Sequence, residues 1–294
     1  MRVGVHVPIA GGLLQAIERA TRLGCETMQI FSRSPRGGKA APIPGELART
    51  FDRARRAAGI EPLAVHTPYV LNLASPQPAM WAYSASLYAE EYARAAALNA
   101  GFLVTHVGSL RGDGEAAGVG RVAEAISRAL RCTGGPTMVL LENTAGAGQG
   151  LGYRFEQLAA IRDAVAEPAR VGVCLDTAHL FAAGYAIHTA GGLHETIAAF
   201  DRLVGLQHLR LVHLNDSKAP FGSRIDRHWH IGQGEIGLAG FGRLLRHPAF
   251  AQMPCVLETP KQTEADDRRN LATVRKLLQH GARAARPCVV LACA

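Results

Sequence analysis

The stretch TMVLLENTAGAGQGLGYRFEQLAAIRDAVAEPARVGVCLD, residues 137–176, changes its pattern three times. It opens with the apolar run Thr137–Glu142, passes through a Gly-rich segment and a segment of helical period, and closes with a second apolar run, Val171–Asp176. Two short apolar runs joined by an amphipathic segment are typical of a strand–helix–strand unit with parallel strands. Both runs also end on a carboxylate, which is unusual for the end of a buried strand.

The same alternation continues in both directions along the chain. The other runs with strand character are Val3–Val7, Thr27–Phe31, Leu63–His66, Phe102–His106, Leu209–Asn215 and Pro254–Glu258. Between them lie segments such as GGLLQAIERATRLG, residues 11–24, in which apolar residues recur at steps of three and four. Eight strands alternating with eight helices predict an α/β fold, a single (β/α)8 TIM barrel over residues 1–294, with its active site on the C-terminal rim of the strands.

The competing fold is a doubly wound open sheet. That fold usually carries a Gly-rich phosphate loop after its first strand, but here the first strand runs into HVPIAGGLLQ, residues 6–15, which is not GxGxxG. The pattern GxxxxGK[ST] does not occur either. The barrel is therefore favoured.

Composition narrows the class of protein further. The 294 residues are 48% hydrophobic and 19% charged, no run of eighteen apolar residues predicts a membrane helix, and the first residues lack a signal-peptide pattern. The six cysteines form no CxxC pair, which favours a reducing, cytoplasmic compartment. A net charge of +8 favours a polyanionic partner such as nucleic acid, although arginine-rich helices alone give the same charge. The apolar segment PCVVLACA, residues 287–294, has no evident role.

Six consecutive predicted strands deliver an ionisable side chain as they leave the apolar interior: His66, His106, Glu142, Asp176, His213 and Glu258. One histidine at a strand end is more often a hydrogen-bonded structural residue than a metal ligand. Six in register are different, because a barrel brings them all to one rim, where uncompensated burial would be costly. The pattern predicts a metal site.

Three further candidates follow just beyond the rim. His179 lies three residues after Asp176 in DTAH, and Asp226 and His228 are spaced so that both side chains of an extended loop face the same way. His230 is a weaker candidate, and the alternative for all of them is a solvated loop. Together with the six strand ends they make nine groups, too many for one zinc ion and suited to two or three, with manganese as an alternative metal.

Motifs along most of the chain resemble those of the endonuclease IV family, the zinc-dependent apurinic/apyrimidinic endonucleases, also called deoxyribonuclease IV. They are HVPIAGGL, HTPYVLNLASP, THVGS, LLENTAGAGQGLG, GVCLDTAHLFAAGY, HLNDSKAPFGSRIDRHWHIGQGEIG and LETP, and they extend from residue 6 to residue 260. The resemblance implies three zinc ions at the mouth of the barrel: one held by His66, His106 and Glu142, a second by Asp176, His213 and Glu258 around the same Glu142, and a third by His179, Asp226 and His228.

The resemblance also implies a function in base excision repair of DNA damage. Family members hydrolyse the phosphodiester 5′ to an abasic site, leave a 3′-hydroxyl and a 5′-deoxyribose phosphate, and trim blocked 3′ ends. The expected partner is double-stranded DNA carrying such lesions, bound by a monomer in the cytoplasm, associated with the nucleoid in a prokaryote. Arg36 in FSRSPR and Tyr69 in HTPY match the family's contacts to the abasic site.

Two positions depart from the family pattern. Val107 stands where a proline usually follows the ligand His106, so a rigid turn is lost while the ligand is kept. Gly37 and Gly38 follow Arg36 where the family usually has an aromatic residue two positions on, and this changes the expected contacts with DNA.

The predicted chemistry is metal-assisted hydrolysis, because a metal ion lowers the pKa of bound water from 15.7 to about 7 and a second ion polarises the phosphate. Glu142, as the shared carboxylate, and Glu258 are the predicted catalytic residues. A xylose-isomerase-like sugar isomerase or epimerase is the main alternative, but it needs only one or two ions and leaves Asp226 and His228 without a role. A metal-bearing DNA-binding protein without turnover is a further alternative, which the nine candidate ligands disfavour.

Overall fold

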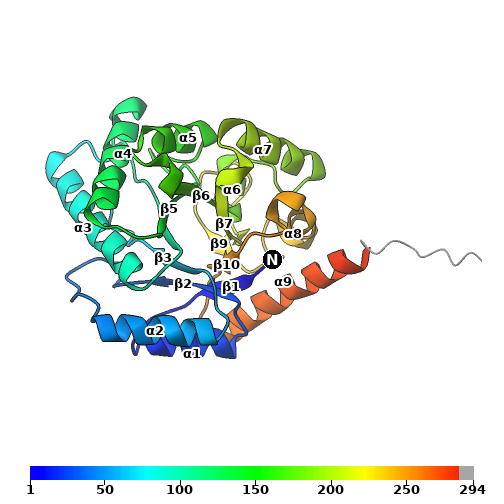
Figure 1. Ribbon diagram of the computed structural model, residues 1–294. Coiled ribbons are helices and arrows are strands. Elements are labelled where there is room, and N and C mark those ends of the chain that lie inside the picture. The colour runs from blue at the N-terminus through cyan, green and yellow to red at the C-terminus, as the bar shows by residue number, and fades with distance from the viewer. Residues whose placement is uncertain (285–294) are drawn as a thin grey trace, which may run out of the picture.

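A closed ring of parallel strands lies at the centre of the molecule (Figure 1). The computed structural model describes residues 1–284, so the apolar segment 287–294, with Cys288 and Cys293, lies outside the described residues. The cysteines inside that range, Cys25, Cys132, Cys174 and Cys255, are free thiols.

Within the described residues, eight strands close the barrel in the order β1-β2-β3-β4-β5-β6-β7-β10. The last strand pairs with the first, with Val3 opposite Cys255. The strands are β1 (Val3–His6), β2 (Thr27–Phe31), β3 (Leu63–His66), β4 (Phe102–Thr105), β5 (Met138–Glu142), β6 (Val171–Asp176), β7 (Leu209–His213) and β10 (Cys255–Leu257). The predicted barrel is confirmed, and each strand end lies within two residues of its predicted place.

Helices surround the barrel as an outer layer (Figure 1). They are α1 (Leu13–Arg22), α2 (Gly45–Ala57), α3 (Pro78–Ala97), α4 (Glu115–Cys132), α5 (Phe155–Ala164), α6 (Thr177–Ala183), α7 (Ala190–Leu203), α8 (Gly237–Arg246) and α9 (Glu264–Ala284). Sequence periodicity did not predict α6, because seven residues show too little of a helical repeat. Its start is fixed instead by Asp176, whose carboxylate accepts the His179 N–H at 2.8 Å. Among the described helices, none has the length and apolar character needed to cross a membrane.

A small hairpin outside the barrel was also not predicted. Strands β8 (Asp216–Ser217) and β9 (His228–Trp229) pair antiparallel, and the ten residues between them form its loop. Asp216 fixes the segment after the hairpin, because its buried carboxylate accepts the N–H groups of Gly232 and Gly234 at 2.9 and 3.0 Å. This hairpin carries two of the candidate ligands.

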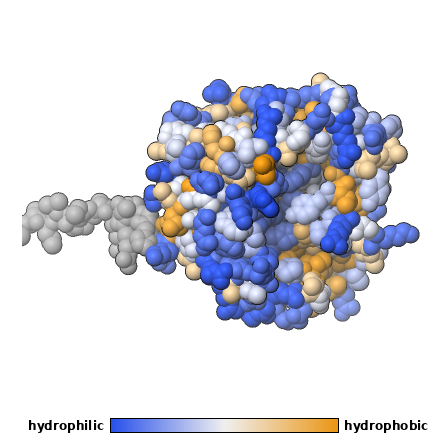
Figure 2. Space-filling view, turned by 180° about the vertical axis from the view of Figure 1, so that it is seen from behind, coloured by the Kyte–Doolittle hydropathy of each residue, from blue (hydrophilic) through white to orange (hydrophobic). Residues whose placement is uncertain are grey.

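Six side chains fill one layer of the barrel interior: Ala64, Val104, Leu140, Cys174, Leu211 and Val256. Each of them lies two residues before one of the six polar strand ends. Because side chains alternate across a strand with a period of two, the polar side chains at the strand ends also point into the barrel. They form the next layer toward the carboxyl end of the strands. The face shown in Figure 2 is mostly hydrophilic, with a hollow near its middle. The barrel thus brings the six polar side chains to one end of its axis.

Candidate metal centre

Histidine and carboxylate side chains gather at the carboxyl end of the barrel. In the described part of the chain they make three overlapping groups in which the potential ligand atoms lie within 4.8 Å of one another. The members are His66, His106 and Glu142; Glu142, Asp176, His213 and Glu258; and Asp176, His179 and His228. Eight of the nine candidates from the sequence therefore fall in these groups.

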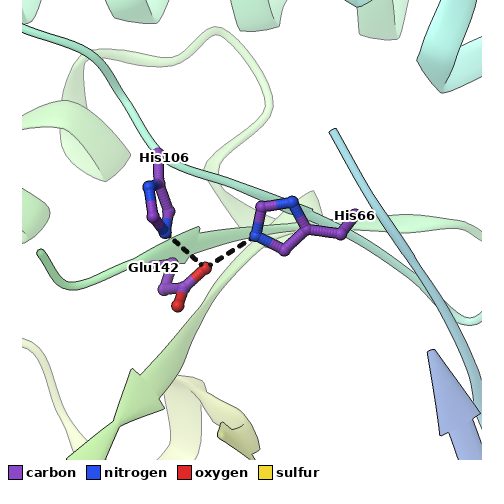
Figure 3. A group of neighbouring side chains, drawn as sticks. All are labelled: His66, His106 and Glu142. Carbon is purple, nitrogen blue, oxygen red and sulfur yellow. Dashed lines mark hydrogen bonds and ion pairs between the residues drawn. The ribbon is translucent and has the colours of Figure 1, made fainter. Parts of the chain in front are cut away.

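The first group is the most compact (Figure 3). His66 Nε2 and His106 Nε2 both lie 3.0 Å from the same oxygen, Oε2 of Glu142. His66 is the last residue of β3, Glu142 is the last residue of β5, and His106 directly follows β4. Three neighbouring strands thus bring one donor atom each close together, and two histidines with one carboxylate are a donor set that zinc takes at catalytic sites.

The second group uses the other oxygen of the same carboxylate. His213 Nδ1 lies 2.9 Å from Oε1 of Glu142 and 3.2 Å from Oε2 of Glu258, and Oδ2 of Asp176 is 3.9 Å away. Because Glu142 presents one oxygen to each group and is fully buried, it could serve as a shared ligand if each group held an ion.

The third group differs in part from the one expected. Asp176 joins His179 and His228 there, with its Oδ2 3.5 Å from His228 Nε2. Asp226 lies beside the group, with Oδ1 3.2 Å from His179 Nε2 and 3.5 Å from His228 Nε2. Asp226 is on the hairpin loop and its side chain is 48% exposed, whereas Asp176 is buried at a strand end. Asp176 is therefore a second carboxylate shared between groups.

Burial and charge oppose one another in this cluster. Burial acts to raise the pKa of Glu142, but the charges of His106 and His213 outweigh it and hold that pKa well below its ordinary value. Burial likewise acts to lower the pKa of His179, but the carboxylates of Asp176 and Asp226 outweigh it and raise that pKa well above the ordinary value. Without metal, a proton on His179 is therefore favoured by the neighbouring carboxylates. A cationic partner is what the donor set lacks, so these residues fit a metal ion.

The far sides of the rings are held by hydrogen-bond partners. His66 Nδ1 lies 2.7 Å from the carbonyl oxygen of Thr67, His179 Nδ1 lies 2.9 Å from that of Asn143, and His228 Nδ1 lies 3.2 Å from that of Glu258. Such partners fix the ring orientation and the tautomer of a ligating histidine. Each of these rings therefore keeps its Nε2 atom for the cluster.

Two residues that orient the second group of side chains were not predicted from the sequence. Gln29 on β2 accepts from His213 Nε2 at 2.9 Å and donates to Glu258 Oε1 at 2.6 Å. Asn215 donates to Asp176 at 2.6 Å and accepts the Glu258 N–H at 2.7 Å. Neither residue is ionisable, so a search for charged strand ends passes over them. For Gln29 the available signal was a polar residue in the middle of an otherwise apolar strand.

The two predicted DNA contacts lie on loops at the same end of the barrel. Arg36 is exposed in the loop after β2. Tyr69 is 64% exposed in the loop after β3, with its ring centroid 5.8 Å from that of His66 and 6.4 Å from that of His106. A cavity of about 320 Å³ opens there, lined by residues that include Tyr69, His106, Arg111 and Asp226. The cavity thus reaches the first group at His106 and also Asp226, which lies beside the third group.

A closed β/α barrel with a histidine and carboxylate cluster at the carboxyl end of its strands defines a structural class of proteins. A family model described as "Xylose isomerase-like TIM barrel" matches residues 17–283. A solved D-psicose 3-epimerase from Clostridium cellulolyticum has a TM-score of 0.66, covers 95% of this chain and 99% of its own, and is 16% identical, so it shares the fold alone.

Two closer likenesses narrow the class. "Probable endonuclease 4" of Chloroflexus aurantiacus is 46% identical over 280 residues, which are 95% of this chain and 98% of the relative. The crystal structure of endonuclease IV from Thermus thermophilus has a TM-score of 0.84 and 37% identity, and the match covers 95% of this chain and all of that one. The chain belongs to the endonuclease IV family, which confirms the resemblance seen in its motifs.

Proposed function

We propose that the protein is a metal-dependent DNA repair endonuclease that hydrolyses the phosphodiester 5′ to an abasic site, leaving a 3′-hydroxyl and a 5′-deoxyribose phosphate. The observation that carries the proposal is the fused cluster, in which Glu142 and Asp176 are each shared by two of three groups. A cluster of this extent suits three ions, whereas a sugar isomerase or epimerase needs one or two. The same site would also trim blocked 3′ ends, since the same bond type is hydrolysed there.

The proposed metal is zinc, with three ions per chain. His66, His106 and Glu142 would hold the first, Glu142, Asp176, His213 and Glu258 the second, and His179 and His228, with Asp176 and Asp226, the third. Zinc at such sites supplies Lewis-acid chemistry, activating water near neutral pH and stabilising charge on a phosphodiester. Manganese at one or more positions is compatible with the same donors.

The protein residues supply the rest of the reaction. Glu142 and Glu258 are the proposed catalytic carboxylates, because both face the centre of the cluster and Glu142 Oε1 and Glu258 Oε2 both lie near His213 Nδ1. Arg36 and Tyr69 are the proposed DNA contacts. An abasic nucleotide has no base to unstack, so turning it toward the cavity beside Tyr69 costs less than turning a normal nucleotide.

The chain is proposed to work as one barrel domain over residues 1–294, as a monomer on duplex DNA in the cytoplasm. Its net charge of +8 favours that polyanionic partner.

The test uses an end-labelled duplex with one tetrahydrofuran abasic analogue, compared with the same duplex undamaged, and zinc-loaded protein. Incision at the analogue alone, with a 3′-hydroxyl product, is the expected result. Glu142→Gln should abolish it, while Glu195→Gln, an exposed change on α7, should leave it intact. If zinc-loaded protein cuts neither duplex, the nuclease proposal fails, and turnover of ketoses and aldoses by the same preparation would favour the isomerase or epimerase alternative.

A further inference from the structure

The loop that carries Arg36 has two glycines at its tip. Gly37 and Gly38 directly follow Arg36, with φ of 79° and 98°. Two consecutive glycines give a backbone access to many conformations. If Arg36 is to meet DNA in one defined position, the loop has to be held from its base.

Two arginines hold the base of this loop on both sides of Arg36. Arg33 Nη1 donates to the carbonyl oxygen of Gly38 at 3.0 Å. Arg94, which reaches in from α3, donates to the carbonyl oxygen of Ala41 at 2.6 Å and to that of Ser32. The segment 32–41 is therefore tied at its start, just after its tip and at its end.

One carboxylate organises both arginines. Glu91 on α3 is fully buried, accepts from Arg33 Nε, and lies 3.8 Å from Arg94 Nε. Its other oxygen accepts the Ser32 hydroxyl at 2.8 Å, and that hydroxyl accepts from Arg94 Nε at 2.8 Å. Arg33 is only 5% exposed, and its other carboxylate partner, Glu90, which lies 2.9 Å from Arg33 Nη2, is 57% exposed. Removing the charge of Glu91 would therefore leave the guanidinium without its one buried carboxylate partner.

The same loop contacts the rim beside the metal centre. The carbonyl oxygen of Pro35 accepts the N–H of Tyr69 at 3.1 Å. Because the Tyr69 ring lies beside His66 and His106, the position of the loop is linked to the place where the lesion would bind.

We propose that Glu91 is a positioning residue for DNA recognition, which acts through Arg33 and Arg94 to hold the loop 32–41 so that Arg36 meets the backbone of damaged DNA. The inference rests on the proposed function for its choice of ligand. Holding the loop before binding reduces the ordering cost on association, so losing the network weakens DNA binding without altering the metal cluster.

The experiment measures binding of the labelled tetrahydrofuran duplex by fluorescence anisotropy, on zinc-loaded full-length protein, for Glu91→Gln, Arg36→Ala and the double variant. Glu91→Gln should raise Kd about tenfold, a size typical of ordering one or two interface side chains. The double variant should bind no more weakly than Arg36→Ala, because both changes remove the same contact. Zinc content and kcat should stay within about twofold of the unmodified protein, since Glu91 contacts no candidate ligand.

Asp52→Asn is the matched control, because Asp52 also pairs with a buried arginine, Arg55, at 2.5 Å, but next to Ile60 at the opposite end of the barrel. It should leave Kd unchanged. If Glu91→Gln does not fold, Arg94→Met decides instead, since it removes two loop anchors and leaves the Arg33 pair with Glu91 intact.

Three results would overturn the inference: Kd unchanged in Glu91→Gln, or in Arg94→Met where that variant decides; Kd unchanged in Arg36→Ala; or effects of Glu91→Gln and Arg36→Ala that multiply in the double variant. Faster hydrogen exchange of residues 32–41 in Glu91→Gln should accompany the loss of affinity. Failure of the proposed function is seen separately, as unmodified protein that does not cut the tetrahydrofuran duplex, and binding remains measurable in that case.

Discussion

Gly108→Ala should destabilise the loop that follows the candidate ligand His106. Gly108 has a φ of +102°, and a Cβ there would lie 2.1 Å from Oδ1 of Asn72 and 3.0 Å from its Cα. Asn72 ties two loops together, because its Oδ1 accepts the Ser109 N–H at 2.9 Å and its Nδ2 donates to the Ser109 carbonyl oxygen at 3.0 Å. An alanine at position 108 displaces that side chain.

Two terms set the size of the effect. A non-glycine residue at this φ costs about 1–3 kcal/mol of backbone strain. Two lost hydrogen bonds add about 1 kcal/mol each. Gly112→Ala is the matched control, because Gly112 lies in the same loop at φ +93° and its Cβ would meet nothing within 4 Å. The control carries the strain alone, so Gly108→Ala should be less stable than Gly112→Ala by about 2 kcal/mol.

The assay is thermal unfolding of the metal-free proteins, so that metal binding does not mask the difference. For a chain of 294 residues, about 2 kcal/mol corresponds to a Tm lower by about 3 °C. Melting temperatures of the two variants within about 1 °C of each other would show that Asn72 does not join the loops as described, and would refute the reasoning.

Four other outcomes are expected. Burial acts to lower the pKa of His179 but Asp176 outweighs it, so zinc must displace a proton there; calorimetry in buffers of different ionisation enthalpy should detect proton release, and equal heats in all buffers would contradict it. Because this pKa is raised in the folded state, its contribution to metal-free stability is complete below about pH 6.5 and is lost as the pH rises through the folded value, which urea unfolding between pH 6 and 9 would measure. Chelation should lower Tm and added zinc should restore it, because zinc at a thousandfold excess over its Kd raises the free energy of unfolding by up to about 4 kcal/mol. An unchanged Tm would argue against resident metal. Asp216→Asn should cost about 1–3 kcal/mol in denaturant unfolding, since the amide cannot accept all the N–H groups that the carboxylate accepts, including that of Ile236 at 3.0 Å; an unchanged midpoint would contradict that role.

The barrel and most of the cluster follow from local patterns. Strands such as Val171–Asp176 are read from an apolar run, and the end of a parallel strand also tells where its last side chain lies in a barrel. The structure brings His66, Glu142 and His213 together at that rim, because the register of the strands is regular and their side chains alternate with a period of two.

What sequence patterns could not give depends on contacts between distant segments. The hairpin of β8 and β9 has two-residue strands, too short for any periodicity, and its position is set by Asp216 bonding to residues that follow it. The sharing of Asp176 by the second and third groups also escaped, since a carboxylate's two oxygens can face different neighbours only in three dimensions. Gln29 was missed because its role depends on His213, 184 residues away.

Because of the β8–β9 hairpin, the candidate metal centre has two parts that differ in how firmly the fold holds their ligands. Six candidate ligands lie at the ends of barrel strands and cannot move away unless the barrel unfolds. Asp226 and His228 lie on the β8–β9 hairpin, whose loop is largely exposed to solvent. If three ions bind as proposed, the ion beside the hairpin would be released before the two held by the strand ends. The site beside the hairpin would then be the first at which a competing metal could exchange.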